Sequence, residues 1–262
     1  ANSRVFCRVR PASSAAAESP LHASEPNRLS LRHASESYSW TFDKVFGTGS
    51  TQAEVFDEVS GLVQTALDGY KVCIFAYGQT GSGKTHTMMN HRAKSPEDVG
   101  LMPRISQSLY DRIEQQIDEH PTKRFLVQCS FLEIYNEIIY DLLAPKARQT
   151  KGGGLEVREA KGIGIYVKDL TEAVVEDSER LGKLLEEGLR QRVTASTKMN
   201  DSSSRSHCVF TVKLHQKDLE DSSGNTIAKL NLVDLAGSER AKATGNEGIR
   251  MKEGANINKS LS

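Results

Sequence analysis

The stretch Gly78-Gln79-Thr80-Gly81-Ser82-Gly83-Lys84-Thr85 decides the fold of this chain. It has the form G-x-x-x-x-G-K-[ST], it follows the apolar run 72–77, and it opens a helix-compatible run over 85–89. A strand, a glycine-rich turn and a helix start form a phosphate-binding loop, because the turn and the helix N-terminus present backbone N–H groups and a positive dipole end. We therefore predict that the phosphates of a nucleotide are bound by Gln79, Thr80, Gly81, Ser82, Gly83, Lys84 and Thr85.

A second apolar run, residues 229–233, ends in an acid and is followed by Asp234-Leu235-Ala236-Gly237. In this D-x-x-G arrangement the acid holds the Mg²⁺ shell and the glycine N–H senses the γ-phosphate. A strand-end Asp on its own usually caps a loop, but the upstream phosphate loop favours the metal role for Asp234. The Thr85 hydroxyl is a second predicted Mg²⁺ ligand, because the last position of the loop supplies one in this motif.

The bulk composition excludes some other classes of protein. The 262 residues carry 34 basic and 34 acidic side chains, so no global charge indicates nucleic-acid or membrane binding. No apolar run approaches the length of a membrane span, and we expect no membrane insertion. The four cysteines lie in apolar strand-like runs without a C-x-x-C pair, which is typical of buried, reduced thiols in a cytosolic protein.

Apolar periodicity predicts the secondary structure. Thr51 to Glu54 form a capping box ahead of a helix over 55–67, and residues 12–36 are expected to be a surface excursion with a short strand at 28–32. Further helices are predicted at 105–117 and 181–189, and strands at 4–10, 38–42, 72–77, 125–139, 155–157, 163–167, 208–214 and 229–234. Gly224-Asn225 is predicted to be the turn of a hairpin into the last of these strands. We therefore predict a single α/β domain of P-loop NTPase type: three layers, with a mainly parallel central sheet and helices on both faces.

Several stretches together resemble the kinesin motor domain, and the resemblance runs along almost the whole chain. Besides the phosphate loop extended to Met88, it rests on Arg8-Val9-Arg10-Pro11, Phe131-Leu132-Glu133-Ile134-Tyr135-Asn136-Glu137, residues 200–207, Asp234 to Arg240, and Asn256 to Leu261. Within the kinesins, residues 5–11 and 66–70 are similar to the kinesin-14 group, whose motors lie at the C-terminus and move toward the microtubule minus end.

The resemblance implies roles for individual residues. Ser203 would lie near the γ-phosphate, Ser204 would approach Mg²⁺ beside Thr85, and Arg205 would form an ion pair with Glu239 that closes the site. Together with Gly237, this ion pair would organise the attacking water. Arg8, Pro11 and His86 would flank the adenine, and the remaining nucleotide-binding residues implied are Arg10 and Asn200.

The resemblance also implies an ATP hydrolase that takes ATP, ADP and Mg²⁺ and binds microtubules in the cytoplasm, with the spindle among the candidate locations. Arg250, Lys252 and Lys259 would meet acidic tubulin, and Lys161 and Lys168 would do so on another loop. Charge alone does not set these side chains apart from ordinary surface residues. A dimer would form through a coiled coil outside this chain.

The family domain runs beyond Ser262, so residues 1–262 are expected to form an incomplete kinesin motor domain. The missing part would include a strand between the first strand and the phosphate-loop strand. The sheet would then lack an interior member and leave backbone groups unpaired.

Other functions fit the sequence less well. A microtubule-binding module without hydrolysis would be expected to lose some of the residues Lys84, Thr85, Ser204, Arg205, Gly237 and Glu239, all of which are present. A GTPase switch is disfavoured because Asn258-Lys259 is followed by Ser260-Leu261 and not by the acid that reads guanine. An AAA-type ATPase is disfavoured because Leu235 stands where a second acid is expected.

Overall fold

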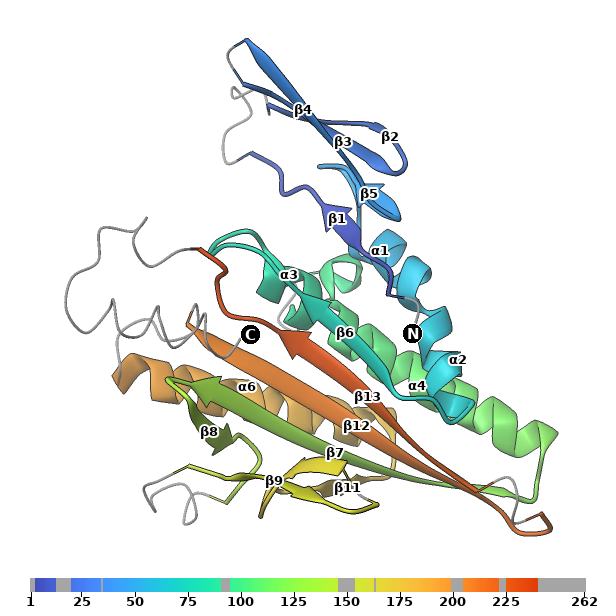
Figure 1. Ribbon diagram of the computed structural model, residues 1–262. Helices are drawn as coiled ribbons and strands as arrows, with labels where there is room; N and C mark the ends of the chain where they lie inside the picture. Colours follow the sequence, from blue (N-terminus) through green and yellow to red (C-terminus); the bar gives the residue numbers. More distant parts are fainter. Residues whose placement is uncertain are drawn as a thin grey trace.

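A computed structural model describes residues 3–12, 20–33, 35–90, 95–145, 154–162, 164–198, 205–221 and 225–239. A large twisted sheet is backed by a layer of helices, and a small three-stranded sheet projects from one end (Figure 1). None of the helices described is long and apolar enough to cross a membrane.

The large sheet is mixed and centres on two long strands. Its strand order is β11 (Ala173–Val175), β7 (Lys123–Tyr135), β12 (Ser206–Asp218), β13 (Thr226–Asp234) and β6 (Val72–Ala76), with β8 (Ile138–Asp141) paired to β7 off this path. β13 and β6 run parallel, whereas the β12–β13, β7–β12, β7–β11 and β7–β8 pairs are antiparallel. The phosphate-loop strand β6 and the acid-bearing strand β13 are therefore neighbours.

The prediction of a mainly parallel sheet is wrong. The segment 219–225 between β12 and β13 is too short for the crossover that parallel strands require, so the two strands form a hairpin. The long run 125–139 also divides into β7 and β8, because Asn136 and Glu137 both have positive φ (51° and 66°) and make a tight turn. The hairpin between β12 and β13 is confirmed, although Gly224 of its predicted turn lies outside the described residues; the alternation of helices and strands was wrongly taken to indicate a parallel sheet.

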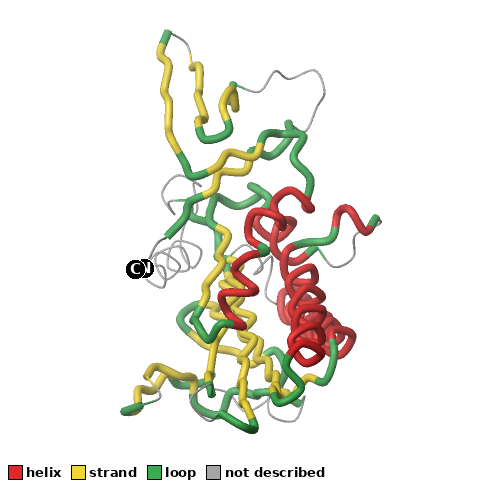
Figure 2. Tube along the Cα trace, turned by 90° about the vertical axis from the view of Figure 1, so that its right-hand side faces the viewer, coloured by secondary structure: helices red, strands yellow, loops and turns green. Residues whose placement is uncertain are grey.

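The helices described lie on one face of the sheet. They are α1 (Gln52–Val59), α2 (Gly61–Leu67), α3 (Lys84–Met89), α4 (Leu101–Glu119) and α6 (Ser178–Lys198), with a 3₁₀ turn η1 (Pro96–Asp98). Because α4 contacts α1, α2, α3 and α6, all of them form one layer, as the side view in Figure 2 shows. Within the described ranges, the prediction of helices on both faces is therefore met on one face.

The capping box at Thr51 and Glu54 is present and begins α1. The predicted single helix over 55–67 is instead two helices that meet at Ser60. The core lies between the helix layer and the sheet, where Phe131 of β7 packs edge to face on Phe210 of β12 at 5.3 Å between ring centroids. Ile105 and Leu109 of α4 are fully buried against this layer.

The first 46 residues contain more strand than predicted. β1 (Phe6–Arg8) pairs in parallel with β5 (Lys44–Phe46). β2 (Leu21–Glu25) and β3 (Arg28–His33), in the segment expected to be an excursion, form an antiparallel sheet with β4 (Glu36–Thr41), which confirms the strand predicted at 38–42. The strand at 28–32 is confirmed, whereas β2 and β5 were missed because each is short and lacks clear alternation. β9 (Val157–Ala160) and β10 (Gly164–Val167) form a separate hairpin.

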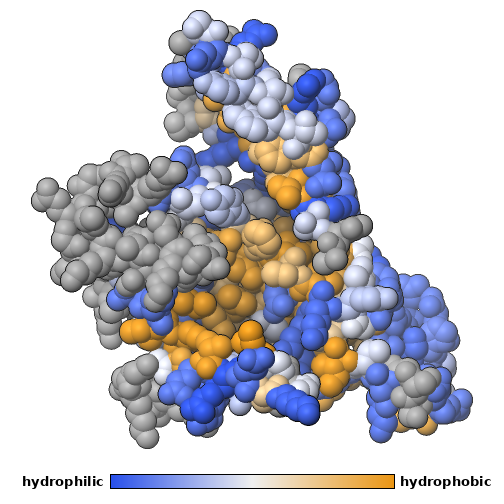
Figure 3. Space-filling view, viewed as in Figure 1, coloured by the Kyte–Doolittle hydropathy of each residue, from blue (hydrophilic) through white to orange (hydrophobic). Residues whose placement is uncertain are grey.

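The sheet face opposite the helices is open within the described residues, and a broad apolar area is visible on it in Figure 3. Phe75 of β6, Leu126 of β7 and Ile227 of β13 are 61%, 44% and 57% exposed on the sheet. Cys73 on β6 is exposed as well, so the expectation of four buried thiols is wrong at that position. In the part of the chain described, β6 pairs with β13 on one side and β1 pairs only with β5.

Candidate active site

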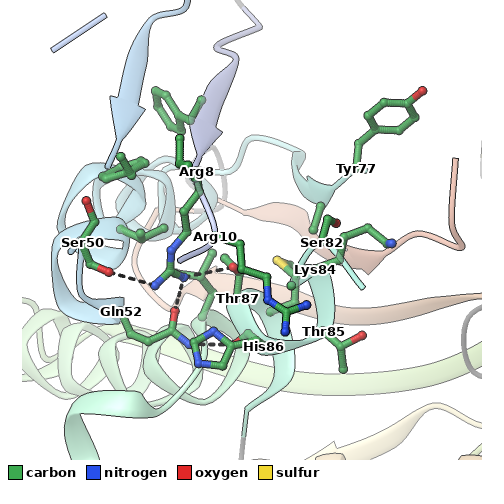
Figure 4. Close-up of a pocket in the computed structure, with 18 of the residues that line it drawn as sticks. Arg8, Arg10, Ser50, Gln52, Tyr77, Ser82, Lys84, Thr85, His86 and Thr87 are labelled. Carbon is green, nitrogen blue, oxygen red and sulfur yellow. Dashed lines mark hydrogen bonds between the residues drawn. The ribbon is translucent and has the colours of Figure 1, made fainter. Parts of the chain in front are cut away.

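The predicted phosphate loop stands between β6 and α3, at the carboxyl end of β6. Gly83 immediately precedes α3 with φ of 100°, a conformation that glycine adopts without a steric penalty. The loop lines a cavity of about 920 Å³ whose other walls come from β1, α1 and the start of α3 (Figure 4). This confirms the strand–loop–helix context on which the motif depends.

Lys84 is folded back onto the loop. Its Nζ donates hydrogen bonds to the carbonyl oxygens of Gly78 and Gln79, at 2.9 and 3.0 Å. Partial burial lowers the pKa of Lys84, although Asp234 and Glu239 act against this effect. The ammonium group is therefore held at the loop by weak neutral acceptors that phosphate oxygens could replace.

Asp234, at the end of β13, is 2% exposed and contacts the start of α3. Its Oδ2 accepts a hydrogen bond from Thr85 Oγ1 at 2.7 Å, as expected for two groups that share a metal shell. Its Oδ1 is buried without a hydrogen-bond partner among the described residues. Buried carboxylate oxygens are nearly always satisfied, so this oxygen fits a Mg²⁺-bound water as its partner. The donor set thus fits Mg²⁺.

Asp234 contacts a buried charge cluster, made by Arg192, Glu133 and Ser206, that sequence reasoning missed. Arg192 of α6 lies 3.5 Å from Asp234 and 3.2 Å from Glu133 of β7, and both of its partners are almost fully buried. Ser206 Oγ donates to Glu133 Oε1 at 2.5 Å and so completes the cluster. A signal was available, because Arg192 follows Leu181, Leu185 and Leu189 on the apolar face of its helix.

The segment that follows β13 is bonded to the phosphate loop through Glu239. The Glu239 carboxylate accepts from Thr80 N at 2.8 Å and from Thr80 Oγ1 at 2.5 Å. Burial alone would raise the pKa of Glu239, but the hydrogen bonds from Thr80 and the charge of Lys84 hold it below its ordinary value. Gly237 is buried between these two side chains, and a Cβ there would collide with both. Glu239 and Gly237 therefore lie at the phosphate loop, and their roles at the attacking water stay predictions.

The remaining switch residues are only partly described. Arg205 lies directly before β12 and is half-buried, so the predicted ion pair with Glu239 stays a prediction. Asn200, Ser203 and Ser204 lie outside the described residues. His207, which was given no catalytic role, is buried and its Nδ1 accepts a hydrogen bond from the Ala236 N–H at 3.1 Å.

The other end of the cavity contains the side chains predicted to flank the base. Arg8, Pro11 and His86 line the cavity, as does Arg10, which was predicted only to bind the nucleotide. Arg10 contacts the Gly81 carbonyl of the phosphate loop, whereas Arg8 turns toward α1 and α3. Gln52, the first residue of α1, also lines the cavity and was missed by sequence reasoning, which used this segment only as a capping box.

The predicted microtubule contacts are described only in part. Lys161 lies in the turn between β9 and β10, and Lys168 follows β10; both are exposed. Arg250, Lys252 and Lys259 lie outside the described residues. The structure therefore brings together the phosphate-side and base-side residues that it describes, and it leaves the proposed tubulin contacts as predictions.

Comparisons with known sequences agree with the resemblance to the kinesin motor domain. The sequence profile of the kinesin motor domain matches residues 8–262. A kinesin-like protein of Oryza sativa subsp. japonica, KIN-14N, is 43% identical over 268 residues that cover 100% of this chain and 35% of the relative. Klp98A of Drosophila melanogaster is 46% identical over 224 residues that cover 85% of this chain and 17% of that protein. This chain thus spans about a third or less of these two relatives.

Solved structures share the fold. A structure described as a fast kinesin matches with a TM-score of 0.87 and 35% identity, covering 97% of this chain and 71% of the other. The motor domain of a Kar3-like kinesin from Ashbya gossypii matches with a TM-score of 0.78 and 34% identity, covering 98% and 76%. The predicted P-loop NTPase-type architecture is confirmed, in the form of a mixed sheet flanked by helices.

Proposed function

Since this chain belongs to the kinesin motor family, we propose that it hydrolyses MgATP, that microtubules stimulate this hydrolysis, and that the cycle drives movement toward the minus end. One observation carries the ATPase proposal. Asp234 Oδ1 is buried without a hydrogen-bond partner among the described residues, and the Asp234 carboxylate contacts the Thr85 hydroxyl. Both residues lie at the phosphate loop, where Lys84 is also bound. The minus-end direction rests on the similarity to kinesin-14 relatives.

The phosphate loop and Lys84 do the binding in this proposal. Backbone N–H groups of residues 79–85 surround the β- and γ-phosphates, and Lys84 exchanges two carbonyl partners for phosphate oxygens, which are stronger acceptors of its charge. Thr85 and Ser204 would hold Mg²⁺, and Asp234 would hold the water shell of the ion. When bound, Mg²⁺ neutralises charge that develops on the transferring phosphoryl group.

Glu239, Gly237 and Arg205 act on the attacking water. When a γ-phosphate occupies the loop, it competes with the Glu239 carboxylate for the Thr80 donors, because both are anions that accept from the same groups. Glu239 then leaves Thr80 and pairs with Arg205, and Ser203 lies near the γ-phosphate. This closure positions water in line and excludes bulk solvent, which is how phosphoryl transfer gains most of its rate.

The partner in this proposal is the acidic microtubule surface. Lys161 and Lys168 are exposed on the β9–β10 hairpin, and Arg250, Lys252 and Lys259 complete the set of basic candidates. Such contacts weaken as salt rises. We also propose that residues 1–262 are part of a larger motor domain in a longer, dimeric protein. In the described part of the chain, β6 pairs with β13 alone, which supports a further strand at its other edge.

The test is ATP turnover by the full-length protein without and with microtubules. We expect slow basal turnover and an increase of at least about tenfold with microtubules. Microtubule binding without turnover would favour a non-hydrolysing module, and tighter binding of GTP than of ATP would favour a GTPase. Plus-end movement in a gliding assay would refute the direction alone.

A further inference from the structure

A single buried amide ties together the base end of the cavity. Gln52 is 2% exposed, and its side chain reaches three separate segments. Its Oε1 accepts from Arg8 Nη1 of β1 at 2.7 Å, and its Nε2 donates to the carbonyl oxygen of His86 in α3 at 2.7 Å and to that of Asp98 in η1 at 3.3 Å. The bonds from Gln52 to Arg8 and His86 are drawn in Figure 4.

The Arg8 guanidinium is held entirely by neutral groups. Besides Gln52, it donates to Thr87 Oγ1 at 3.0 Å and to the Ser50 carbonyl at 3.1 Å. Within the described residues, no carboxylate forms an ion pair with Arg8. Partial burial lowers the pKa of Arg8, although Glu54 acts against this. Arginine side chains stay protonated in proteins, so Arg8 is charged, and its three hydrogen bonds hold the planar guanidinium in a fixed orientation at the cavity wall.

We propose that Gln52 is a positioning residue that sets nucleotide affinity and base selection through Arg8 and His86, and this inference rests on the ATPase proposed above. Gln52 sits at the first turn of α1, where it joins the wall from β1 to the wall from α3. Loss of the amide would free Arg8 to rotate and would leave the His86 and Asp98 carbonyls without this donor. The wall that faces a planar base would then lose its fixed geometry.

The phosphate end does not depend on this amide. Lys84 is held by the carbonyls of Gly78 and Gln79, and Thr85 by Asp234, so no hydrogen bond of Lys84 within the described residues involves Gln52. A ligand without a base should therefore be insensitive to a change at Gln52. A general loss of folding would instead weaken every ligand together.

The experiment compares three ligands in the full-length protein: MgATP, MgGTP and magnesium tripolyphosphate, which has phosphates but no base. Gln52→Met keeps the side-chain volume and removes the amide. We expect it to raise KM for ATP about tenfold, the effect of one hydrogen bond to a charged group, with kcat within about twofold. The preference for ATP over GTP should fall, and the inhibition constant of tripolyphosphate should stay unchanged.

Thr87→Val is a second variant that removes another acceptor of Arg8 without changing side-chain shape, and we expect a smaller increase of about threefold in KM for ATP. Gln107→Met is the matched control, because Gln107 is an exposed glutamine whose side chain bonds Asp111 on the same helix, and this variant should behave as the wild type.

Three results would overturn the role of Gln52: an equal loss of tripolyphosphate and ATP affinity, a fall in kcat at unchanged KM, or no change in either variant. Failure of the wild-type protein to bind MgATP would refute the proposed function itself.

Discussion

The two ends of the cavity are built from different chemistry. At the phosphate end, charged groups contact one another or face the loop: Lys84, Asp234, Arg192 and Glu239. At the base end, the Arg8 guanidinium donates hydrogen bonds to the Gln52 amide, the Thr87 hydroxyl and the Ser50 carbonyl. The phosphate end is therefore arranged to stabilise and move charge, whereas the base end is arranged to hold a fixed geometry.

The largest effect that tests this comparison should follow from removing Arg192. Arg192→Met leaves the buried carboxylates of Glu133 and Asp234 without their cation, and we expect the free energy of unfolding to fall by about 3–5 kcal/mol in urea titrations. Arg180→Met removes an exposed pair with Glu187 and should cost less than about 1 kcal/mol. Equal effects of the two variants would show that the buried cluster does not support the phosphate end.

The next effect concerns ligand affinity. Lys84→Ala should weaken MgATP and magnesium tripolyphosphate alike, by about a hundredfold, because both ligands depend on the charge at the loop. Calorimetric titration of each ligand measures this, with the exposed Lys183 changed to Ala as the control. A loss confined to MgATP would mean that the two ends cannot be separated as described.

A smaller effect should follow at the base end. Thr51→Ala removes the capping box of α1, in which Thr51 Oγ1 accepts from Glu54 N at 3.2 Å and Glu54 accepts from Thr51 N at 2.7 Å. We expect the free energy of unfolding to fall by about 1 kcal/mol, and KM for ATP to rise slightly because Gln52 follows the cap directly. An unchanged urea midpoint would show that the cap does not hold the start of α1.

The smallest effect should be a pH dependence at the phosphate end. Burial lowers the pKa of His207 from its ordinary value of 6.5, and its neutral Nδ1 accepts the Ala236 N–H. As the pH falls below 6.5, the unfolded chain therefore binds a proton at His207 at a higher pH than the folded chain does. The contribution of neutral His207 to stability is present above pH 6.5 and is lost as the pH falls further. His207→Gln should flatten this slope in urea titrations between about pH 5 and 7.5. A slope equal to that of the wild type would exclude His207 as its source.

Much of the phosphate end could be predicted because its residues are contiguous in sequence. The loop 78–85 and the acid-ended strand carry fixed spacings, and the structure places Thr85 and Asp234 in contact as expected. Arg192 and Glu133 were missed because their ion pair joins a helix to a strand 59 residues away. No local pattern reports such a pair, although each residue stands on an apolar face.

The base end was predicted less well for the same reason. Arg8 and His86 were assigned by resemblance, but the amide that joins them comes from a third segment, at Gln52. The hairpin that joins β12 to β13 was predicted, but the sheet direction was still wrong because the alternation of helices and strands does not report the antiparallel pairing of β7 with β12. Sequence patterns found the elements, and long-range pairing decided their order.

The most direct test of the account is the behaviour of Glu239→Ala. Its carboxylate contacts Thr80 of the phosphate loop, and in the proposed cycle it moves to organise the attacking water. We predict that Glu239→Ala binds MgATP with an affinity within a few fold of the wild type. Its rate of ATP hydrolysis should fall by about a hundredfold or more in single-turnover measurements with microtubules. Near-normal turnover in this variant would contradict the account.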